Sequence, residues 1–518
     1  MTRMSLGRNA LITFFVGMLG AGCGSSDSDF ASAPSFNGDN SESPAAPGAD
    51  TPPGEEQEIE SFYEAPVATS RFVWIANPTS GRVAYVDAST LQVKTVDAGN
   101  APTYLAGLPG QTDDAAIVLN VLSEDATLLR IVNGAFTSQT FKTAAKTNSW
   151  AISKDGKFAI AWGDARKADS APKTEGFQDL TILDLVKGTS TSLAVGYRPV
   201  AISFSATDAK AYAVTQDGIA VIDLTAAAPK VDKNIAISAT PTEDPGTRDV
   251  SITPDGTLAL VRRDGVATIS VVSLDTGTRT EVTLSGAVTD LDLTPLGDRA
   301  VAVVRSTSEV AILPVPAIAQ DPLTFGKVTI TGETIGSVSL SSDGSSGLLY
   351  TNASAVERLT LLSLSSPGTF RTVRVYAPVL SVHTTPDGAH ATVLHATSES
   401  ESAFSLLPLA AALPARIVAT TAPPYAVALA NDRVVVAERS DSKKIYGVDI
   451  AKLPELTSTH YDLASPPLSA GIVPSVRRAY VAQRHPEGRI TFVHLDTGVA
   501  STLTGFELGA RVVDGSKP

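Results

Sequence analysis

Apolar and small residues alternate along most of the chain, in short segments that are separated by turn residues. In residues 200–203, 250–253 and 427–430, Val, Ile or Leu occupies every second position, and Ala, Ser or Thr lies between. A period of two predicts β-strands. Because the intervening residues are small rather than charged, we expect these strands to pack on both faces, as strands do where several sheets converge on an axis.

Each alternating strand is followed by a turn whose residues repeat. Thr-Pro-Asp-Gly occurs at 253–256 and 385–388, and Thr-Pro-Leu-Gly occurs at 294–297. Proline presets φ, aspartate hydrogen-bonds to nearby backbone and glycine accepts a positive φ, so turn geometry accounts for these residues. We therefore predict a structural role for the turn aspartates Asp155, Asp255, Asp343 and Asp387. The same interpretation covers the aspartates that recur at the end of a later strand, namely Asp184, Asp223, Asp275, Asp449 and Asp496.

A third apolar strand and a less regular fourth strand complete each unit, as in residues 269–277 and 280–284. About ten such units follow one another between residues 65 and 513, one about every 45 residues. A unit of this size cannot bury its own apolar faces, so its neighbours must cover them. Four strands per unit predict an all-β fold, a β-propeller of four-stranded blades.

The number of units leaves three arrangements open: one ring of ten blades, a ring of seven or eight blades with irregular outer units, or two smaller rings. No Pro-, Ser- and Gly-rich break appears in the middle of the sequence, so we favour one continuous ring. Residues 61–68 or 506–513 could supply a closing strand, which would cover a sheet edge that otherwise invites aggregation. A polar insertion at 164–177 is expected to form a protruding loop.

The repeat resembles the YVTN-type β-propeller repeat, in which a Val-Ala-x-Ser-Pro-Asp-Gly segment precedes an apolar strand and a segment ending in Asp-x-x-Thr-Gly. Residues 249–256 and 269–277 carry this resemblance most clearly, and it extends over about 65–513. It implies a propeller like those of bacterial surface-layer proteins and lactonases. It implies no particular activity, because the repeated residues are those of the scaffold.

The N-terminus carries an export signal ahead of the repeats. Arg3 and Arg8 form a positively charged region ahead of a short apolar stretch at 10–19, as in a secretory signal peptide. The apolar stretch is too short to span a bilayer well. The stretch ends in Leu19-Gly-Ala-Gly-Cys23, which resembles a bacterial lipobox. The resemblance implies that residues 1–23 form a lipoprotein signal peptide and that Cys23 is lipidated.

Residues 24–64 link the lipidated cysteine to the repeats. They contain Ser, Gly, Pro and Ala with ten acidic residues and neither Lys nor Arg. Such a composition buries too little apolar surface to offset the entropy lost on ordering, so we predict a disordered, acidic tether followed by the propeller at 65–518. The resemblance to lipoproteins, with Gly24 after Cys23, implies an outer-membrane protein facing the periplasm or the cell surface.

Composition and motifs exclude several kinds of function. The net charge is −14, and the absence of a basic stripe argues against binding nucleic acid. Cys23 is the only cysteine, so cysteine-based metal sites are impossible. The sequence lacks Gly-x-Ser-x-Gly, phosphate-binding loops and His-Glu-x-x-His, and the odd spacing of His390 and His395 turns them to opposite faces of a strand. We therefore predict no catalytic residues, no metal and no cofactor.

A ligand or partner site is expected at the mouth of the central tunnel, where the inner strands begin. Two positions that are small in other units are polar here, Asp292 and His383, and a polar side chain in a packed position needs a partner or water. Together with charged residues that enter neighbouring inner strands, they define the candidate site: Arg198, Arg248, Asp290, Asp292 and His383. The alternative is ordinary loop polarity with a buried hydrogen-bonded pair.

Two functions are compatible with the sequence. The first is a non-catalytic envelope lipoprotein, anchored to the membrane through Cys23, whose propeller binds another envelope protein as a scaffold. The second, which rests on fold resemblance alone, is a lactonase-like hydrolase or a small-ligand-binding propeller. Carboxylates and histidines that converge in the tunnel would favour the second function.

Overall fold

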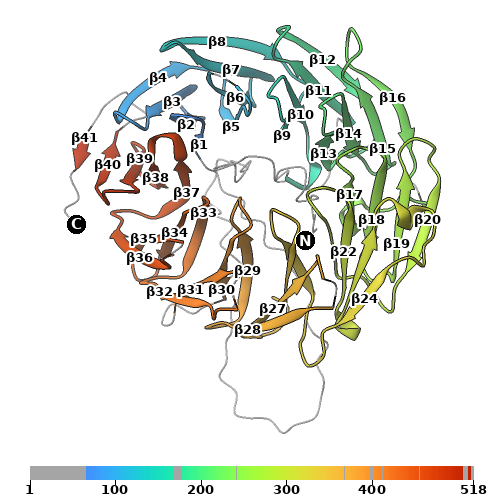
Figure 1. Ribbon diagram of the computed structural model, residues 1–518. Coiled ribbons are helices and arrows are strands. Elements are labelled where there is room, and N and C mark those ends of the chain that lie inside the picture. The colour runs from blue at the N-terminus through green and yellow to red at the C-terminus, as the bar shows by residue number, and fades with distance from the viewer. Residues whose placement is uncertain are drawn as a thin grey trace.

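The computed structural model describes residues 66–111, 113–167, 178–240, 242–366, 368–396, 402–410, 412–453, 455–505 and 512–514. Within these residues the chain forms ten antiparallel sheets, each built from strands that are consecutive in sequence. The sheets follow one another around a central axis as the blades of a single ring (Figure 1). This confirms the predicted all-β propeller and, among the three arrangements, the single ring of ten blades.

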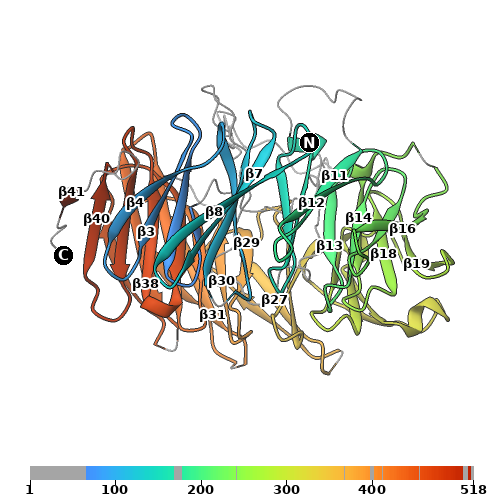
Figure 2. The ribbon, with the colours of Figure 1, turned by 90° about the horizontal axis from the view of Figure 1, so that it is seen from above.

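In every blade the first strand is innermost and later strands lie progressively outward (Figure 1). Seen from its edge, the ring has strands that run between its two faces (Figure 2). Blades 1 to 5 consist of β1 (Val67–Ala68), β2 (Phe72–Asn77), β3 (Arg82–Asp87), β4 (Gln92–Asp97); β5 (Pro102–Gly107), β6 (Asp114–Asn120), β7 (Asp125–Val132), β8 (Ala135–Lys142); β9 (Ser149–Ile152), β10 (Phe158–Trp162), β11 (Asp179–Asp184), β12 (Thr189–Ala194); β13 (Ala201–Phe204), β14 (Lys210–Val214), β15 (Ile219–Asp223), β16 (Lys230–Ile235); β17 (Arg248–Ile252), β18 (Leu258–Arg263), β19 (Thr268–Ser273) and β20 (Arg279–Thr283).

Blades 6 to 10 follow the same plan, and the last has a fifth strand. They consist of β21 (Asp290–Leu293), β22 (Arg299–Val304), β23 (Glu309–Pro314), β24 (Gly326–Thr329); β25 (Ser337–Leu340), β26 (Ser346–Tyr350), β27 (Arg358–Ser363), β28 (Phe370–Arg374); β29 (Val379–Thr384), β30 (His390–His395), β31 (Ala403–Pro408), β32 (Arg416–Ala419); β33 (Pro424–Leu429), β34 (Arg433–Ser440), β35 (Ile445–Lys452), β36 (Thr457–Asp462); β37 (Pro467–Val473), β38 (Arg478–Gln483), β39 (Arg489–His494), β40 (Ala500–Thr504) and β41 (Val512–Asp514). Short 3-10 turns are η2 (Ala165–Lys167), η3 (Pro245–Thr247), η4 (Arg305–Thr307), η5 (Ala317–Ala319) and η6 (Pro474–Val476).

The ring closes by packing of blade 1 against blade 10, and no blade is shared between the two ends of the chain. β1 pairs with β2 as the innermost strand of its own blade, whereas β41 adds to the outer edge of β40. The two segments expected to supply a closing strand therefore lie in different blades. Val73 and Phe492 belong to one apolar cluster across the seam, and the Tyr480 hydroxyl donates to the Pro66 carbonyl at 3.0 Å.

The blades adhere because apolar residues cover both of their faces. In blade 9, for example, Val434 and Val436 pack with blade 8, whereas the alternate residues Val435 and Ala437 pack with blade 10. A period of two sends successive side chains to opposite faces, so the alternation read from the sequence becomes the packing between blades.

The turn aspartates have the structural role that the repeat predicts. Asp343 Oδ1 accepts hydrogen bonds from Ser341 Oγ at 2.6 Å and from the Ser345 backbone nitrogen at 3.0 Å. Asp155, Asp255 and Asp387 make the equivalent contacts, and the following glycines have φ between 67° and 71°. The repeated string is therefore explained by local geometry.

Several predicted segments lie outside the described residues: the signal peptide, Cys23, the tether and residues 168–177 of the insertion. Across the part of the chain that the structure describes, no helix reaches the length and hydropathy of a membrane-spanning helix.

Candidate functional site

Three of the five predicted tunnel-mouth residues lie at or just before the start of an innermost strand, whereas Asp292 lies further along its strand and His383 lies next to the far end of its strand. Arg198 precedes β13, Arg248 and Asp290 begin β17 and β21, Asp292 lies in β21, and His383 lies in β29. They enter blades 4, 5, 6 and 8, so the ring distributes them around the tunnel. Arg198 and Arg248 do contact a common segment, residues 243–244.

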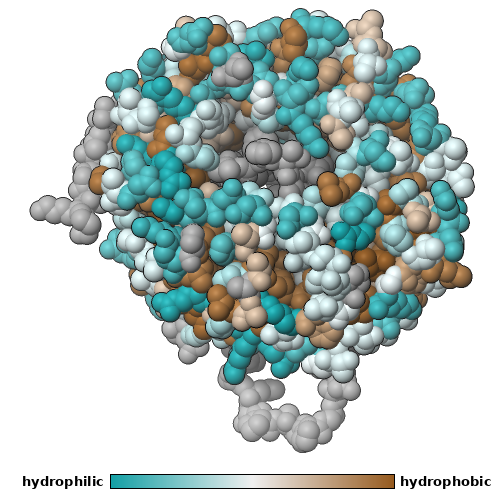
Figure 3. Space-filling view, viewed as in Figure 1, coloured by the Kyte–Doolittle hydropathy of each residue, from teal (hydrophilic) through white to brown (hydrophobic). Residues whose placement is uncertain are grey.

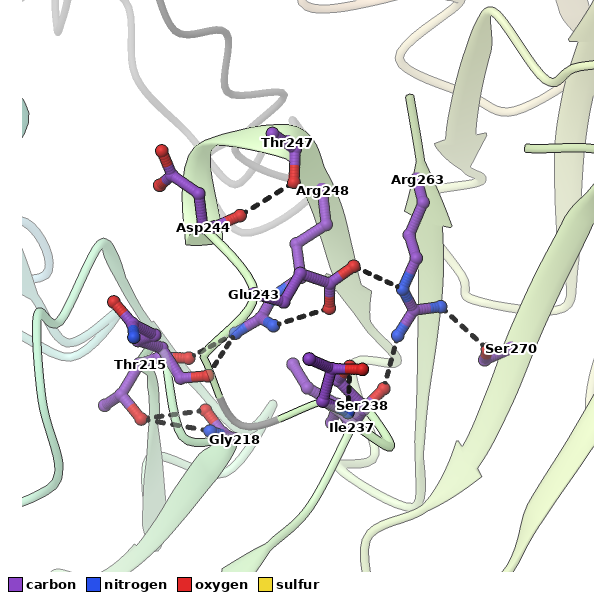
Figure 4. Close-up of polar contacts among 12 residues, drawn as sticks. Thr215, Gly218, Ile237, Ser238, Glu243, Asp244, Thr247, Arg248, Arg263 and Ser270 are labelled. Carbon is purple, nitrogen blue, oxygen red and sulfur yellow. Dashed lines mark hydrogen bonds and ion pairs between the residues drawn. The ribbon is translucent and has the colours of Figure 1, made fainter. Parts of the chain in front are cut away.

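Arg248 is buried in a group of charges between blades 4 and 5, which we call the arginine cluster: Arg248, Glu243 and Arg263 (Figure 4). The Arg248 side chain is 0% exposed. Its Nη2 donates to the carbonyls of Thr215 at 2.6 Å and Gln216 at 2.9 Å. Its Nη1 donates to Glu243 Oε2 at 3.0 Å, and Arg263 Nε donates to Glu243 Oε1 at 2.8 Å. Because Thr215 and Gln216 follow a strand of blade 4, the cluster connects the two blades.

Backbone carbonyls balance the excess positive charge of the arginine cluster. Arg263 also donates to the Ile237 carbonyl at 2.6 Å and to Ser270 Oγ at 3.0 Å. Burial alone would raise the pKa of Glu243, but hydrogen bonds and the two guanidinium charges hold that pKa below its usual value. Both oxygens of Glu243 and both terminal nitrogens of Arg248 are therefore occupied.

Arg198 lies at the outside of the same junction. Its Nη1 is 3.4 Å from Gln216 Oε1 and 3.5 Å from Asp244 Oδ1. Asp244 is about half exposed, and long ion pairs of this kind contribute little to stability. Arg198 thus differs from Arg248, whose side chain is enclosed by its partners.

Asp290 connects blade 6 to blade 7. Its Oδ2 accepts from the Val338 backbone nitrogen at 2.7 Å, across β21 and β25, and its Oδ1 accepts from the Leu291 nitrogen at 2.9 Å. Asp292 is buried in the same strand. His383 Nε2 lies 3.0 Å from Ser381 Oγ on its own strand. Asp290, like Arg248, has its partner in a neighbouring blade.

A second group of ionisable residues lies in blade 9, and we call it the carboxylate cluster: Glu438, Asp449 and His460. The three residues lie on the adjacent strands β34, β35 and β36. Asp449 is directly opposite His460, and Glu438 is opposite Gly447, two residues before Asp449. One ligand atom from each residue lies within 4.8 Å of the others. Alternation along the strands places the three side chains on one face of the blade.

That face of blade 9 is turned toward blade 8. Val434 and Val436 pack with blade 8, and Glu438 follows them at the same period of two. The connection between the two blades also meets the cluster here. Glu438 Oε2 accepts from the backbone nitrogens of Thr421 at 2.8 Å and Ala422 at 3.1 Å, and from Thr421 Oγ1 at 2.9 Å. These three hydrogen bonds fix the Glu438 side chain through its Oε2 atom alone.

Gly447 makes room for the imidazole of His460. A Cβ at position 447 would lie 2.5 Å from His460 Cε1. His460 Nδ1 is 3.3 Å from Asp449 Oδ2 and 3.7 Å from Glu438 Oε1. Glu438 and Asp449 are buried, whereas the His460 side chain is 29% exposed, so the cluster opens to solvent on the side of His460.

The three groups change one another's protonation. Burial, together with the neighbouring Glu438, raises the pKa of Asp449. Hydrogen bonds to Asp449 and Glu438 raise the pKa of His460. Burial opposes ionisation of Glu438 as well, but contacts with His460 and Asp449 lower its pKa on balance. Two buried carboxylates thus require a positive partner, which a protonated His460 can supply.

The grouping of Asp449 with the strand-end aspartates is wrong. Asp184, which ends β11, accepts from the backbone nitrogens of Val186 and Lys187 in a turn. Asp449 lies inside β35, which continues to Lys452, so no turn backbone follows it. The available signal is Glu438, which directly follows the apolar run 434–437 of a second strand.

No known protein family and no curated protein matches the sequence of this chain. Solved structures do match its fold. A structure of the eukaryotic initiation factor is similar with a TM-score of 0.51 and 13% identity, over 76% of this chain and 93% of that one. The β-propeller domain of Cps50 (Swd1) from Myceliophteria thermophila gives 0.35 and 11%, over 62% of this chain and 93% of that one. At 13% identity the first likeness shows a shared fold alone.

Proposed function

We propose that this chain is an envelope lipoprotein, anchored in the outer membrane through Cys23, whose propeller is a non-catalytic scaffold that binds another envelope protein. The lipobox-like segment that ends at Cys23 supports the anchor, since acyl chains at that residue would hold the protein at a membrane. The acidic segment 24–64 would then act as the tether between membrane and propeller.

Exposed apolar side chains at turns on one face of the ring carry the proposal of a protein partner. Strands alternate in direction within a blade, so turns after the first and third strands emerge on one face, opposite the face where innermost strands begin. Five large apolar residues, each more than half exposed, lie in such turns: Val186, Leu296, Leu323, Leu413 and Val499. Side chains of this kind at turn tips are available for burial by a partner.

A surface on which hydrophobic and hydrophilic residues are mixed is also compatible with reversible binding of a partner protein. On the face of the ring that Figure 3 shows, hydrophobic residues are interspersed among hydrophilic ones. Interfaces between independently folded proteins have a similar mixture, with polar groups around apolar contacts.

The hydrolase alternative gains no support from the arrangement of ionisable groups. It required carboxylates and histidines that converge in the tunnel. Among the described residues, the group with that composition is the carboxylate cluster. Its three strands are the second to fourth of blade 9, and the innermost strand, β33, lies between them and the tunnel.

Crosslinking in native cells, followed by purification of the tagged chain, tests the proposal. We expect one envelope protein in stoichiometric amount. Substituting Leu296 and Leu323 together with Asp, both in blade 6, should abolish its recovery. The matched control is Leu122→Asp with Val266→Asp, two exposed apolar positions in turns of the opposite face, and it should leave recovery unchanged.

The anchor is tested separately, by following the chain between membrane and soluble fractions. Cys23→Ser should release the protein from the membrane fraction, because the acylated thiol is lost. Failure to recover a partner under several growth conditions, or equal loss in both double variants, would refute the scaffold. Membrane retention of Cys23→Ser would refute the anchor.

A further inference from the structure

We propose that the carboxylate cluster of blade 9 is a binding site for Zn²⁺, with Glu438 Oε1, Asp449 Oδ2 and His460 Nδ1 as its three protein ligands. These atoms come from three neighbouring strands and meet on the face turned to blade 8. Carboxylate oxygens and an imidazole nitrogen are ligands that Zn²⁺ accepts. The inference is independent of the scaffold function proposed above.

The contacts within the cluster, which include one long hydrogen bond, are longer than charge-assisted hydrogen bonds usually are and close to the separations of ligands around a metal. A charged N–H donor and a carboxylate normally approach to about 2.7–2.9 Å. His460 Nδ1 is instead 3.3 Å from Asp449 Oδ2 and 3.7 Å from Glu438 Oε1. Ligand atoms about 2.0 to 2.2 Å from a tetrahedral Zn²⁺ lie roughly 3.3 to 3.6 Å from one another. Small movements of these side chains would therefore complete the coordination.

Glu438 turns one oxygen toward the cluster and uses the other outside it. Its side chain is 0% exposed, and among the described residues Oε1 has no hydrogen-bond donor. Three donors from Thr421 and Ala422 hold the other oxygen, so they fix the direction of Oε1 toward Asp449 and His460. Outer contacts that orient a ligand in this way are typical of metal sites.

Gly447 and the exposure of His460 define the rest of the site. The imidazole occupies the space that a side chain at 447 would fill, which sets the ring beside Asp449. Because His460 is 29% exposed, water can reach the fourth position. Three protein ligands and one open position suit Zn²⁺, whereas Ca²⁺ requires six to eight oxygen ligands.

Binding is measured on the full chain, purified in detergent, stripped with EDTA and titrated with Zn²⁺ by calorimetry. We expect one equivalent to bind, and His460→Asn and Asp449→Asn each to weaken binding by more than about 10-fold, because loss of even an outer contact that orients a ligand costs about that much. The matched control is His485→Asn, in a turn of blade 10, which should bind like the wild type. Replacing Zn²⁺ by Co²⁺ should give the visible spectrum of a tetrahedral site in the wild type but not in His460→Asn.

A readout on the wild type keeps the inference testable if a variant does not fold. Zn²⁺ in excess should raise the melting temperature of the stripped protein, whereas the same concentrations of Ca²⁺ and Mg²⁺ should not, because only the bound ion stabilises the folded state. Absence of a bound equivalent in the wild type would overturn the proposal. So would binding that survives both His460→Asn and Asp449→Asn.

Discussion

Two charged clusters lie at junctions between blades, and their charges are balanced in opposite ways. The arginine cluster, between blades 4 and 5, has two guanidinium groups and one carboxylate; terminal nitrogens of both arginines reach backbone carbonyls, and Arg248 Nε has no partner among the described residues. The carboxylate cluster, between blades 8 and 9, has two carboxylates and one imidazole. One of its buried oxygens has no donor among the described residues.

This difference distinguishes a purely structural contact between blades from a candidate cation-binding site. Backbone carbonyls are abundant at the ends of strands and can absorb the extra donors of an arginine. A buried carboxylate has no such supply once nearby N–H groups are used in sheets, and an unpaired charge in the interior is costly. An excess of buried acceptors therefore indicates a position where a cation completes the structure.

The largest effect is expected from removing Arg248. Arg248→Met leaves Glu243 with one fewer partner and removes a donor from the carbonyls of Thr215 and Gln216, so the free energy of unfolding should fall by about 3–5 kcal/mol. Arg82→Met is the control, because its ion pair with Asp97 is exposed and should contribute less than about 1 kcal/mol. Equal shifts in urea denaturation would show that the arginine cluster is not a buried connection.

The contact between blades 7 and 8 is of a third kind, because it contains a neutral buried histidine. His395 lies on the strand face that packs against blade 7, and its Nε2 is 2.8 Å from Ser405 Oγ. Burial lowers its pKa from 6.5 to about 4. Below pH 6.5 the unfolded chain takes up a proton that the folded chain does not, so stability should fall as pH drops from about 6.5 to 4.

The loss reaches about 3 kcal/mol at the acid end. Melting temperatures measured against pH check this, and His395→Gln should remove that part of the acid sensitivity. The same substitution at His485, in a turn of blade 10, should leave the wild-type profile in place. A His395→Gln profile that parallels the wild type would show that this junction is insensitive to protonation.

A repeated turn should give a smaller effect than either junction. Asp343→Ala removes an acceptor from Ser341 Oγ and the Ser345 nitrogen, and we expect a loss of about 1 kcal/mol in chemical denaturation, as for other local side-chain-to-backbone bonds. Asp275, in another turn, is about two-thirds exposed, and its substitution by Ala should have less effect. A loss as large as that of Arg248→Met would contradict a purely local role.

The smallest effect is expected from Glu438→Gln in EDTA. The amide oxygen can still accept from Thr421 and Ala422, while loss of one negative charge relieves repulsion with Asp449. Stability should therefore change by less than about 1 kcal/mol, in contrast to Arg248→Met. Destabilisation by several kcal/mol in urea would mean that the charge of Glu438 is already balanced, as in the arginine cluster.

The sequence was sufficient for the architecture because the repeat specifies it locally. The alternation at 250–253 and the turn at 253–256 predict two strands and their connection without reference to the rest of the chain, and ten such units leave few arrangements. The single ring is confirmed, and the turn aspartates behave as predicted. Each of these features depends on residues that are close in sequence.

The two charged clusters depend on contacts between residues that are distant in sequence and on the exact lengths of strands. Neither could be predicted from the sequence. Arg248 finds its partners 32 and 33 residues earlier, in the preceding blade. The repeat places Asp449 in a turn, because nothing in its sequence indicates that β35 continues to Lys452. The carboxylate cluster needs the registers of three strands at once, and Gly447 acquires its meaning only when His460 lies over it.

Because blades 1 and 10 share no sheet at the seam, the ring does not require the chain to begin at this particular blade. Every blade is a continuous stretch of polypeptide, and the seam is sealed by side chains rather than by a shared sheet. A circularly permuted gene that opens the chain at any other connection between blades would still encode ten whole sheets. Recombination between repeats could likewise add or remove one blade without cutting a sheet, so the size of the ring is open to change in single genetic steps.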